Sequence, residues 1–268
     1  MCGGRGSCGS ARRSAAALAA VVAILLGAAP ARAVDAFEIQ VYDATVDKPG
    51  SVGMEVHANS VISGVRTSVP PELPAHRQSH FTLEPAIGIT DWWEAGMYLQ
   101  TTLLPDGSFE YAGSKLRTKF VVPSRGAGRV GWGVNMELSR IPEHYDRNRW
   151  GAEIRPIVTW TSPGGAVYTS VNPIIDMSLA GSGRSEAPAF EPAATICYVI
   201  EGLLSFGLEY YASFGPLGSW QPLSAQEHYL YEVINIVRWR RLEVNLGAGQ
   251  GLTEASNGFV AKTILGFR

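Results

Sequence analysis

From about residue 51 to the end, apolar and polar residues alternate at every second position in segments of roughly ten residues. In the run 130–138 the apolar set is Val130, Trp132, Val134, Met136 and Leu138, and the residues between are Gly131, Gly133, Asn135 and Glu137. The same period recurs over 167–178, 204–214 and 242–249. Successive side chains of a strand point to opposite faces, so each segment has one apolar and one polar face. The pattern predicts β-strands, because a helix would mix the two sets.

The alternating segments predict strands near 51–60, 78–89, 92–104, 109–122, 128–140, 150–161, 165–178, 188–199, 202–214, 226–237, 241–249 and 258–267. About twelve strands of this length are typical of a transmembrane β-barrel, whose strands are even in number. The run 37–42 also alternates, but a thirteenth strand would put the two termini on opposite sides of the membrane. The predicted fold class is therefore all-β, an antiparallel transmembrane β-barrel of about 12 strands over residues 51–268, preceded by a pre-barrel segment over 34–50.

The connections between these strands alternate in length. Short ones fall at 90–91, 123–127, 162–164, 200–202 and 238–241, and long ones at 62–77, 141–149, 179–187, 215–225 and 250–257. Outer-membrane barrels have short periplasmic turns and longer external loops. Aromatic residues lie beside both sets, as expected of two interfacial girdles. Beside the short turns lie Trp92, Trp93, Phe120, Trp160, Tyr198, Trp239 and Phe267, and beside the long loops lie Phe109, Tyr111, Trp150, Phe190, Phe214 and Tyr229.

Residues 1–33 have the three parts of a secretory signal peptide. Arg5, Arg12 and Arg13 form a basic region, residues 15–26 form an apolar core, and Ala31-Arg32-Ala33 has the small-x-small pattern of a cleavage site. An uncleaved anchor helix is the alternative, which the short, Ala-rich run disfavours. No cysteine stands where a lipoprotein would need one, Cys2 and Cys8 leave with the signal, and Cys197 has no partner for a disulfide.

Charge and composition narrow the class further. The chain has 22 Lys+Arg and 24 Asp+Glu; residues 1–33 hold four Arg and no acid, so the remainder has 18 against 24, a net charge of −6. This balance argues against a nucleic-acid partner. The chain is 46% hydrophobic and only 17% charged, where about 25% is usual for a soluble domain. A barrel with lipid outside and polar groups inside explains both values, and a soluble periplasmic β-sandwich binding protein is the alternative.

With the apolar set outward, a group of charged residues faces the lumen: Glu55, Glu84, Lys115, Arg117, Lys119, Glu137, Glu153, Arg155, Asp176, Glu191, Glu209, Glu243 and Lys262. Two interpretations of these charged residues are open. They form ion pairs that fill and stiffen the barrel, or they form a constriction of mixed sign that selects solutes. Four sites place a proline inside a predicted strand, Glu84-Pro85, Arg155-Pro156, Asn172-Pro173 and Glu191-Pro192, and such prolines predict β-bulges. The hypothesis is that Glu84, Arg155, Asn172, Asp176 and Glu191 converge near mid-depth. The predicted constriction residues are Glu84, Arg117, Arg155, Asn172, Asp176, Glu191 and Glu209.

Enzymatic chemistry has little support in the sequence. The five histidines, His57, His76, His80, His144 and His228, are scattered, and no H-E-x-x-H, C-x-x-C, P-loop or G-x-S-x-G motif occurs. Barrel lipases and acyltransferases use a few Ser, His and acidic residues, which leaves His57 and His228 as the catalytic alternatives. We predict no catalytic residue, no metal and no cofactor.

Two stretches resemble a known family. The strand-turn-strand over 81–96, with Gly-Ile-Thr-Asp at 88–91, and the closing stretch 245–253, with Gly-Leu-Thr at 251–253, are similar to bacterial outer-membrane barrels named after the MetA pathway of phenol degradation. The resemblance covers most of the mature chain and implies a channel or uptake protein for small aromatic or apolar compounds, without catalytic residues. One departure is that Phe267 is followed by Arg268, whereas outer-membrane strands usually finish on an aromatic residue. It indicates either a truncated chain or an assembly signal that tolerates one extra residue.

The sequence thus favours an outer-membrane channel or uptake protein for small solutes in a Gram-negative bacterium. The alternative is a closed structural or adhesion barrel without a conducting pore. The expected partners are outer-membrane lipid, the export and barrel-assembly machineries, and a solute that the sequence does not identify.

Overall fold

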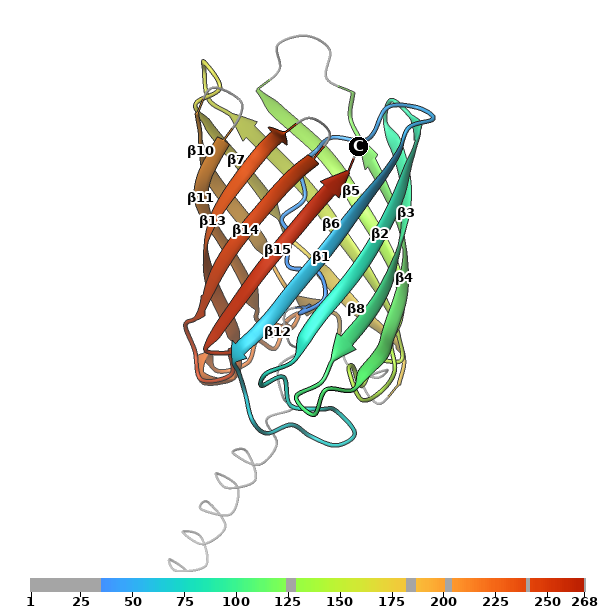
Figure 1. The fold of residues 1–268 in the computed structure, drawn as a ribbon, viewed down its shortest axis with the longest axis vertical. Helices are drawn as coiled ribbons and strands as arrows, with labels where there is room; N and C mark the ends of the chain where they lie inside the picture. Colours follow the sequence, from blue (N-terminus) through green and yellow to red (C-terminus); the bar gives the residue numbers. More distant parts are fainter. Residues whose placement is uncertain (1–34, 124–128, 182–186, 201–203, 240–241, 268) are drawn as a thin grey trace, which may run out of the picture. The chain divides into compact units, whose positions relative to one another are not determined.

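The chain from Asp35 onward forms a closed β-barrel in the computed structural model (Figure 1). The structure describes residues 35–123, 129–181, 187–200, 204–239 and 242–267. The predicted signal peptide over 1–33 lies outside the described residues and stays a prediction. Within the described ranges no helix has the length and apolar character that a membrane span requires.

Among the described residues, fifteen strand segments make up the wall. The first six are β1 (Val52–Ser63), β2 (Ser79–Thr90), β3 (Trp93–Leu103), β4 (Phe109–Val121), β5 (Val130–Arg140) and β6 (Trp150–Thr161). Then follow β7 (Val167–Asn172), β8 (Ile175–Ala180), β9 (Ala189–Phe190), β10 (Ala193–Ile200), β11 (Leu204–Ser213), β12 (Gly215–Pro216), the 3-10 turn η1 (Leu223–Ala225), β13 (Glu227–Trp239), β14 (Leu242–Gly251) and β15 (Phe259–Phe267). β8 continues β7, β10 continues β9 and β12 continues β11, so the fifteen segments amount to twelve barrel strands.

The sheet closes because each of these strands pairs antiparallel with two neighbours. β1 pairs with β2 and with β15, and β7 pairs with β6 on one side and with β10 on the other. Met54 lies opposite Phe267 in the closing pair, so the first and last strands meet at the end with the short turns. Closure leaves no unpaired edge among the strands that the structure describes. The predicted all-β antiparallel barrel of about 12 strands is confirmed.

Burial along each strand is the inverse of that in a soluble protein. In β4 the side chain of Leu116 is 61% exposed, whereas its neighbours Lys115 and Arg117 are 6% and 8% exposed. A surface that exposes apolar groups and encloses charged ones suits hydrocarbon outside and a polar interior. A β-sandwich would bury the apolar set in one core instead, so the sandwich alternative is wrong. This architecture agrees with the predicted bacterial outer-membrane location.

Exposed aromatic side chains occur at both ends of the barrel, as the predicted girdles require. Trp92, Trp160 and Tyr198 are exposed at the short-turn end. Phe109, Tyr111 and Trp150 are exposed at the long-loop end. Tyr229 does not belong to this set: it is 3% exposed and its hydroxyl donates to Glu227 at 2.8 Å. Its position on the inward-facing set of β13 explains the difference.

Of the four strand prolines, three interrupt the hydrogen-bond ladder without shifting its register, so they do not form the predicted bulges. Ile154 pairs with Ile175 and Val158 with Val171, so the register of β6 is the same on both sides of Pro156 and Pro173. These two prolines therefore lie opposite each other, where neither needs a partner for a missing N–H. Pro85 also interrupts its ladder with β3 without a shift. Bulges at these three prolines were a wrong expectation. Only at Glu191-Pro192 does the register with the next strand change, by one residue.

Candidate functional site

Residues 35–48, called here the N-terminal segment, lie inside the barrel (Figure 1). Towards the long-loop end the Phe37 ring lies 4.5 Å from the ring of His80. Towards the short-turn end the backbone N–H of Asp47 donates to Glu94 at 2.7 Å, and Pro49 forms a bridge with Gly88. The segment therefore follows the lumen from one half of the barrel to the opposite rim, and it then enters β1.

Alternation within the N-terminal segment matches two unlike inner walls. Glu38 points to the wall of β4 and β6, where Lys115 lies 3.2 Å and Arg155 3.5 Å from its carboxylate. Ile39 is buried in an apolar cluster on the opposite wall, which includes Tyr211 and Tyr231. The polar side of the segment thus contacts charged wall residues, and its apolar side contacts apolar ones. The period-two pattern of 37–42 is explained by this arrangement, without a thirteenth strand in the wall.

Tyr42 is held by backbone hydrogen bonds to side chains of β7. Its backbone N–H donates to the side-chain oxygen of Asn172 at 2.7 Å. Its carbonyl accepts from the Asn172 amide at 3.0 Å and from the Ser170 hydroxyl at 2.6 Å. Since Asn172 and Ser170 are fully buried, these bonds exclude competition from bulk water.

Three cationic side chains surround the ring of Tyr42. The guanidinium carbon of Arg155 lies 4.5 Å from the ring centroid, the Lys119 ammonium 5.4 Å and the Arg117 guanidinium carbon 5.8 Å. Cations within about 6 Å of an aromatic face are attracted to it. The Tyr42 hydroxyl also forms a hydrogen bond with the hydroxyl of Tyr98. Ring, hydroxyl and backbone together fix the segment at mid-depth.

The inner face of β4 presents a row of basic residues, each paired with acids. Lys115 lies 2.5 Å from Asp35 and 3.1 Å from Glu137. Further pairs on β4 are Arg117–Glu84 at 2.5 Å, Arg117–Glu94 at 2.8 Å and Lys119–Glu94 at 3.6 Å. On β6, Arg155 pairs with Glu153 at 2.7 Å. Buried charges need such partners, since removing one leaves the other uncompensated at a cost of about 3–5 kcal/mol. Asp35 and Glu38 make the N-terminal segment part of this network.

A hydrogen bond from Lys262 anchors the segment to the opposite wall. Lys262 of β15 pairs with Glu209 of β11, and the hydroxyl of Tyr211 donates to Glu209 at 2.6 Å. The Lys262 ammonium also donates to the carbonyl of Ile39 at 3.0 Å. The N-terminal segment is therefore bound to both sides of the barrel.

At the long-loop end the connection between β5 and β6 covers the segment. The Tyr145 ring meets Phe37 edge-on, with the ring centroids 5.9 Å apart. The Tyr145 hydroxyl donates to Glu110 at 3.0 Å. Partial burial and this hydrogen bond raise the pKa of Tyr145 to about 12, so the phenol stays neutral and remains a donor.

Beside the segment, towards the short-turn end, a cavity of about 550 Å³ remains. Apolar residues, among them Val199, Ile236 and Ile264, line part of it. Its acidic lining residues are Asp43, Asp47, Glu55, Glu84, Glu94, Glu209 and Glu243, and its basic ones are Arg117, Lys119 and Lys262. The excess of acids gives this part of the lumen a negative character.

The structure places five of the seven predicted constriction residues in buried positions of the lumen: Glu84, Arg117, Arg155, Asn172 and Glu209. Glu84 and Arg117 contact each other directly. Arg155 and Asn172 are linked through the N-terminal segment, which both of them bind. Glu209 lies on the other wall with Lys262. That these five residues form a constriction therefore stays a prediction.

The other two predicted constriction residues, Asp176 and Glu191, are only partly buried. Asp176 lies opposite Glu153 of β6, and Glu191 accepts a hydrogen bond from Ser213 at 3.2 Å. Both lie in the half of the barrel beyond the Asn172-Pro173 break, towards the long loops. Their convergence with the other residues at mid-depth stays a prediction.

The role of the N-terminal segment was not predicted, and neither were Glu38, Tyr42 and Tyr98 as site residues. Two signals were present in the sequence. One is the alternation of 37–42, and the other is Gly88, where a Cβ atom would lie 2.3 Å from the carbonyl oxygen of Asp47. A glycine at that point allows the segment to pass directly over β2.

No family model matches the chain, and no curated protein matches it. Similarity to the phenol-degradation group therefore stays a resemblance in pattern.

Solved structures show the same fold. The COG4313 outer membrane channel from Pseudomonas putida F1 superposes with a TM-score of 0.62 at 11% identity, covering 86% of this chain and 99% of that one. The KdgM porin superposes with a TM-score of 0.54 at 6% identity, covering 81% of this chain and 98% of that one. The NanC porin superposes with a TM-score of 0.52 at 9% identity, covering 81% of this chain and 100% of that one. The three share the outer-membrane β-barrel fold with this chain.

Proposed function

We propose that this protein is an outer-membrane channel for small solutes, exported through its signal peptide, in which the N-terminal segment restricts the lumen. The observation that carries the proposal is the closed barrel with a charged interior, where a cavity of about 550 Å³ lies beside the segment. A wall built only for support would favour apolar packing, because buried charge pairs contribute little stability against well-packed apolar residues. The channel and porin folds that resemble this chain also support it.

We propose further that the solutes combine an apolar or aromatic body with a polar edge. The two walls of the lumen differ: one carries Lys115, Arg117 and Arg155 with their acids, and the other carries the Tyr211 and Tyr231 cluster. A solute with both kinds of surface can exchange contacts with both walls, whereas a uniformly polar one cannot. The alternating N-terminal segment binds in this way.

Single-channel recording and liposome swelling test the proposal. The folded protein is compared with a variant that lacks residues 35–48, after heat-modifiable migration confirms that each forms a barrel. We expect small, infrequent openings for the full chain, larger and longer ones for the variant, and faster swelling with aromatic acids than with sugars of similar size. If the deletion variant also fails to conduct, the alternative of a closed structural or adhesion barrel is correct. Conduction with equal rates for aromatic acids and sugars would contradict the solute class alone.

A further inference from the structure

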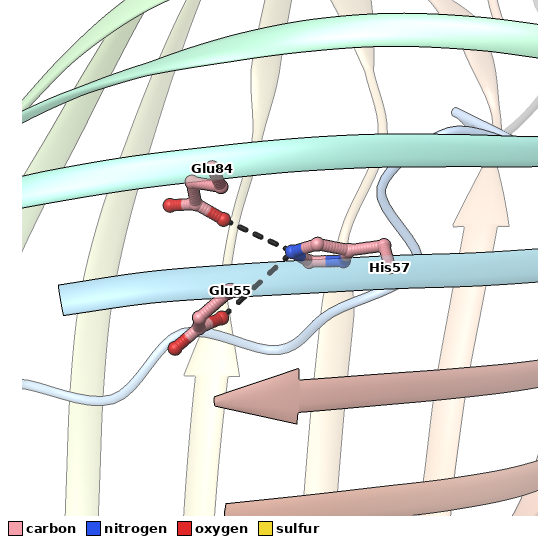
Figure 2. A group of neighbouring side chains, drawn as sticks. All are labelled: Glu55, His57 and Glu84. Atoms are coloured by element: carbon pink, nitrogen blue, oxygen red, sulfur yellow. Dashed lines mark hydrogen bonds and ion pairs between the residues drawn. The ribbon is translucent and has the colours of Figure 1, made fainter. Parts of the chain in front are cut away.

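Two acidic side chains and a histidine meet on the inner face of β1 and β2 (Figure 2). The Nε2 atom of His57 lies 3.0 Å from Oε2 of Glu84 and 3.8 Å from Oε2 of Glu55. One ligand-type atom from each residue lies within 4.8 Å of the others. Two neighbouring strands of a closed sheet hold all three residues, so the backbone positions are rigid.

The register of β1 and β2 makes this cluster unusual. Glu55 and Glu84 are direct cross-strand partners, and His57 follows Glu55 by two residues on the same face. Like charges directly opposite each other destabilise a sheet. The facing oxygens therefore favour a positive charge between them, and the imidazole of His57 reaches both oxygens (Figure 2).

Arg117 does not fill that position. Its Nε atom binds Oε1 of Glu84, whereas Oε2 is the oxygen that faces His57. On the other side, the amide of Gln40 donates to Oε2 of Glu55 at 3.0 Å. Both carboxylates are thus oriented by a neighbour, as metal-binding carboxylates usually are.

We propose that Glu55, His57 and Glu84 form a binding site for a divalent transition-metal ion such as Zn²⁺ in the lumen. Zinc bonds to nitrogen and oxygen of about 2.0–2.2 Å place tetrahedral ligand atoms roughly 3.4 Å apart. The two distances from the histidine nitrogen, 3.0 and 3.8 Å, lie on either side of that value. One imidazole with two carboxylates suits this class of ion, whereas Ca²⁺ and Mg²⁺ prefer oxygen ligands alone.

The site has a route of access and room for a further ligand. His57 and Glu84 have fully buried side chains, but that of Glu55 is 19% exposed. Both carboxylates line the cavity of about 550 Å³, where acids outnumber bases. Three protein ligands leave the remaining coordination position open towards this space. Because Gln40 belongs to the N-terminal segment, the ion and the segment share Glu55.

Metal titration of the folded, untagged protein in detergent tests the site. Binding of Co²⁺ is followed by its visible absorbance and that of Zn²⁺ by calorimetry. We expect one ion per chain, and an affinity at least tenfold lower in His57→Gln and in Glu55→Gln. The matched control is His144→Gln, which removes a loop histidine that lies 3.4 Å from Glu110; we expect its affinity to stay within twofold of the unmodified chain.

The variants also cover a failure to fold. If His57→Gln does not give a heat-modifiable barrel, Glu55→Gln at the edge of the cavity tests the site on its own. Equal metal affinity in Glu55→Gln and the unmodified chain would overturn the proposal, and so would the absence of one-to-one binding. Since the readout is metal binding and not conduction, the result is independent of the proposed channel function.

Discussion

Tyr42 and Asn172 are joined by two hydrogen bonds although 130 residues separate them in the chain. The Tyr42 N–H donates to the side-chain oxygen of Asn172, and the Asn172 amide donates to the Tyr42 carbonyl. One side chain thereby satisfies both backbone groups of a residue that has no strand partner of its own. An enclosed backbone segment needs this, because buried N–H and C=O groups are costly when left unpaired.

Replacing Asn172 with alanine removes both bonds and is expected to loosen the N-terminal segment. Two net hydrogen bonds are worth about 1–3 kcal/mol, so the population with the segment detached should rise roughly 5- to 150-fold. The measurement is the open probability in single-channel recordings. Thr169→Ala on the outward-facing set of the same strand serves as the control. An open probability equal to that of the control would mean that Asn172 does not hold the segment.

Gly88 gives a second, independent test of whether the N-terminal segment restricts the lumen. In Gly88→Ala the new methyl group would lie 2.3 Å from the Asp47 carbonyl oxygen, so the backbone of the segment must move. We expect larger conductance together with an unchanged barrel, as judged by heat-modifiable migration. Gly266→Ala is the matched control, because its added Cβ meets its nearest neighbour at an ordinary 3.4 Å. Identical conductance in the two variants would show that the passage over Gly88 does not restrict the pore.

The strands could be predicted from the sequence because two different solvents, lipid and lumen, impose a period of two on every one of them. The inner wall was predictable for the same reason: Glu84, Arg117 and Arg155 belong to the polar sets. The N-terminal segment was not, because its partners lie on strands far apart in the sequence. Lys262, for example, donates to Ile39 across 223 residues, and no local pattern records such a contact. Bulges were predicted at Pro156 and Pro173 because alternation alone does not specify the register between strands. It is the register that places these two prolines opposite each other.

Neutralising Arg155 is expected to make the channel more selective for cations. Arg155 is 3% exposed and lies beside Glu38 and Glu153. Arg155→Gln removes one positive charge next to both carboxylates, and Glu38 then keeps only Lys115, in a lumen that is already acidic. The reversal potential under a KCl gradient should shift towards that of K⁺. Arg149→Gln, which changes an exposed loop pair with Glu143, should leave the reversal potential unchanged. If selectivity and conductance stay the same in Arg155→Gln, the constriction hypothesis fails for this residue.

Glu232 places a carboxylate on the lipid-facing side of β13. The residues two before and two after it on the same strand, Leu230 and Ile234, are 38% and 50% exposed, and the intervening Tyr231 and Val233 are buried. Glu232 shares the outward set and is itself exposed, opposite Leu208 on β11. The position is near the middle of the strand, where hydrocarbon surrounds the barrel. A carboxylate at that depth is costly, because hydrocarbon offers it no hydrogen-bond partners.

Glu232→Leu is therefore expected to stabilise the barrel, by up to about 2 kcal/mol, since acidic groups cost less at this depth than the 2–4 kcal/mol of basic ones. The measurement is the free energy of unfolding in urea for protein folded into phospholipid vesicles. Glu209→Leu should do the opposite, because it leaves Lys262 buried without its carboxylate, at a cost of about 3–5 kcal/mol. Changes of opposite sign in the free energy of unfolding would distinguish the lipid-facing side of the wall from its lumen-facing side. A loss of stability in Glu232→Leu would mean that this carboxylate does not face lipid, and the assignment of the outward set of β13 would have to be revised.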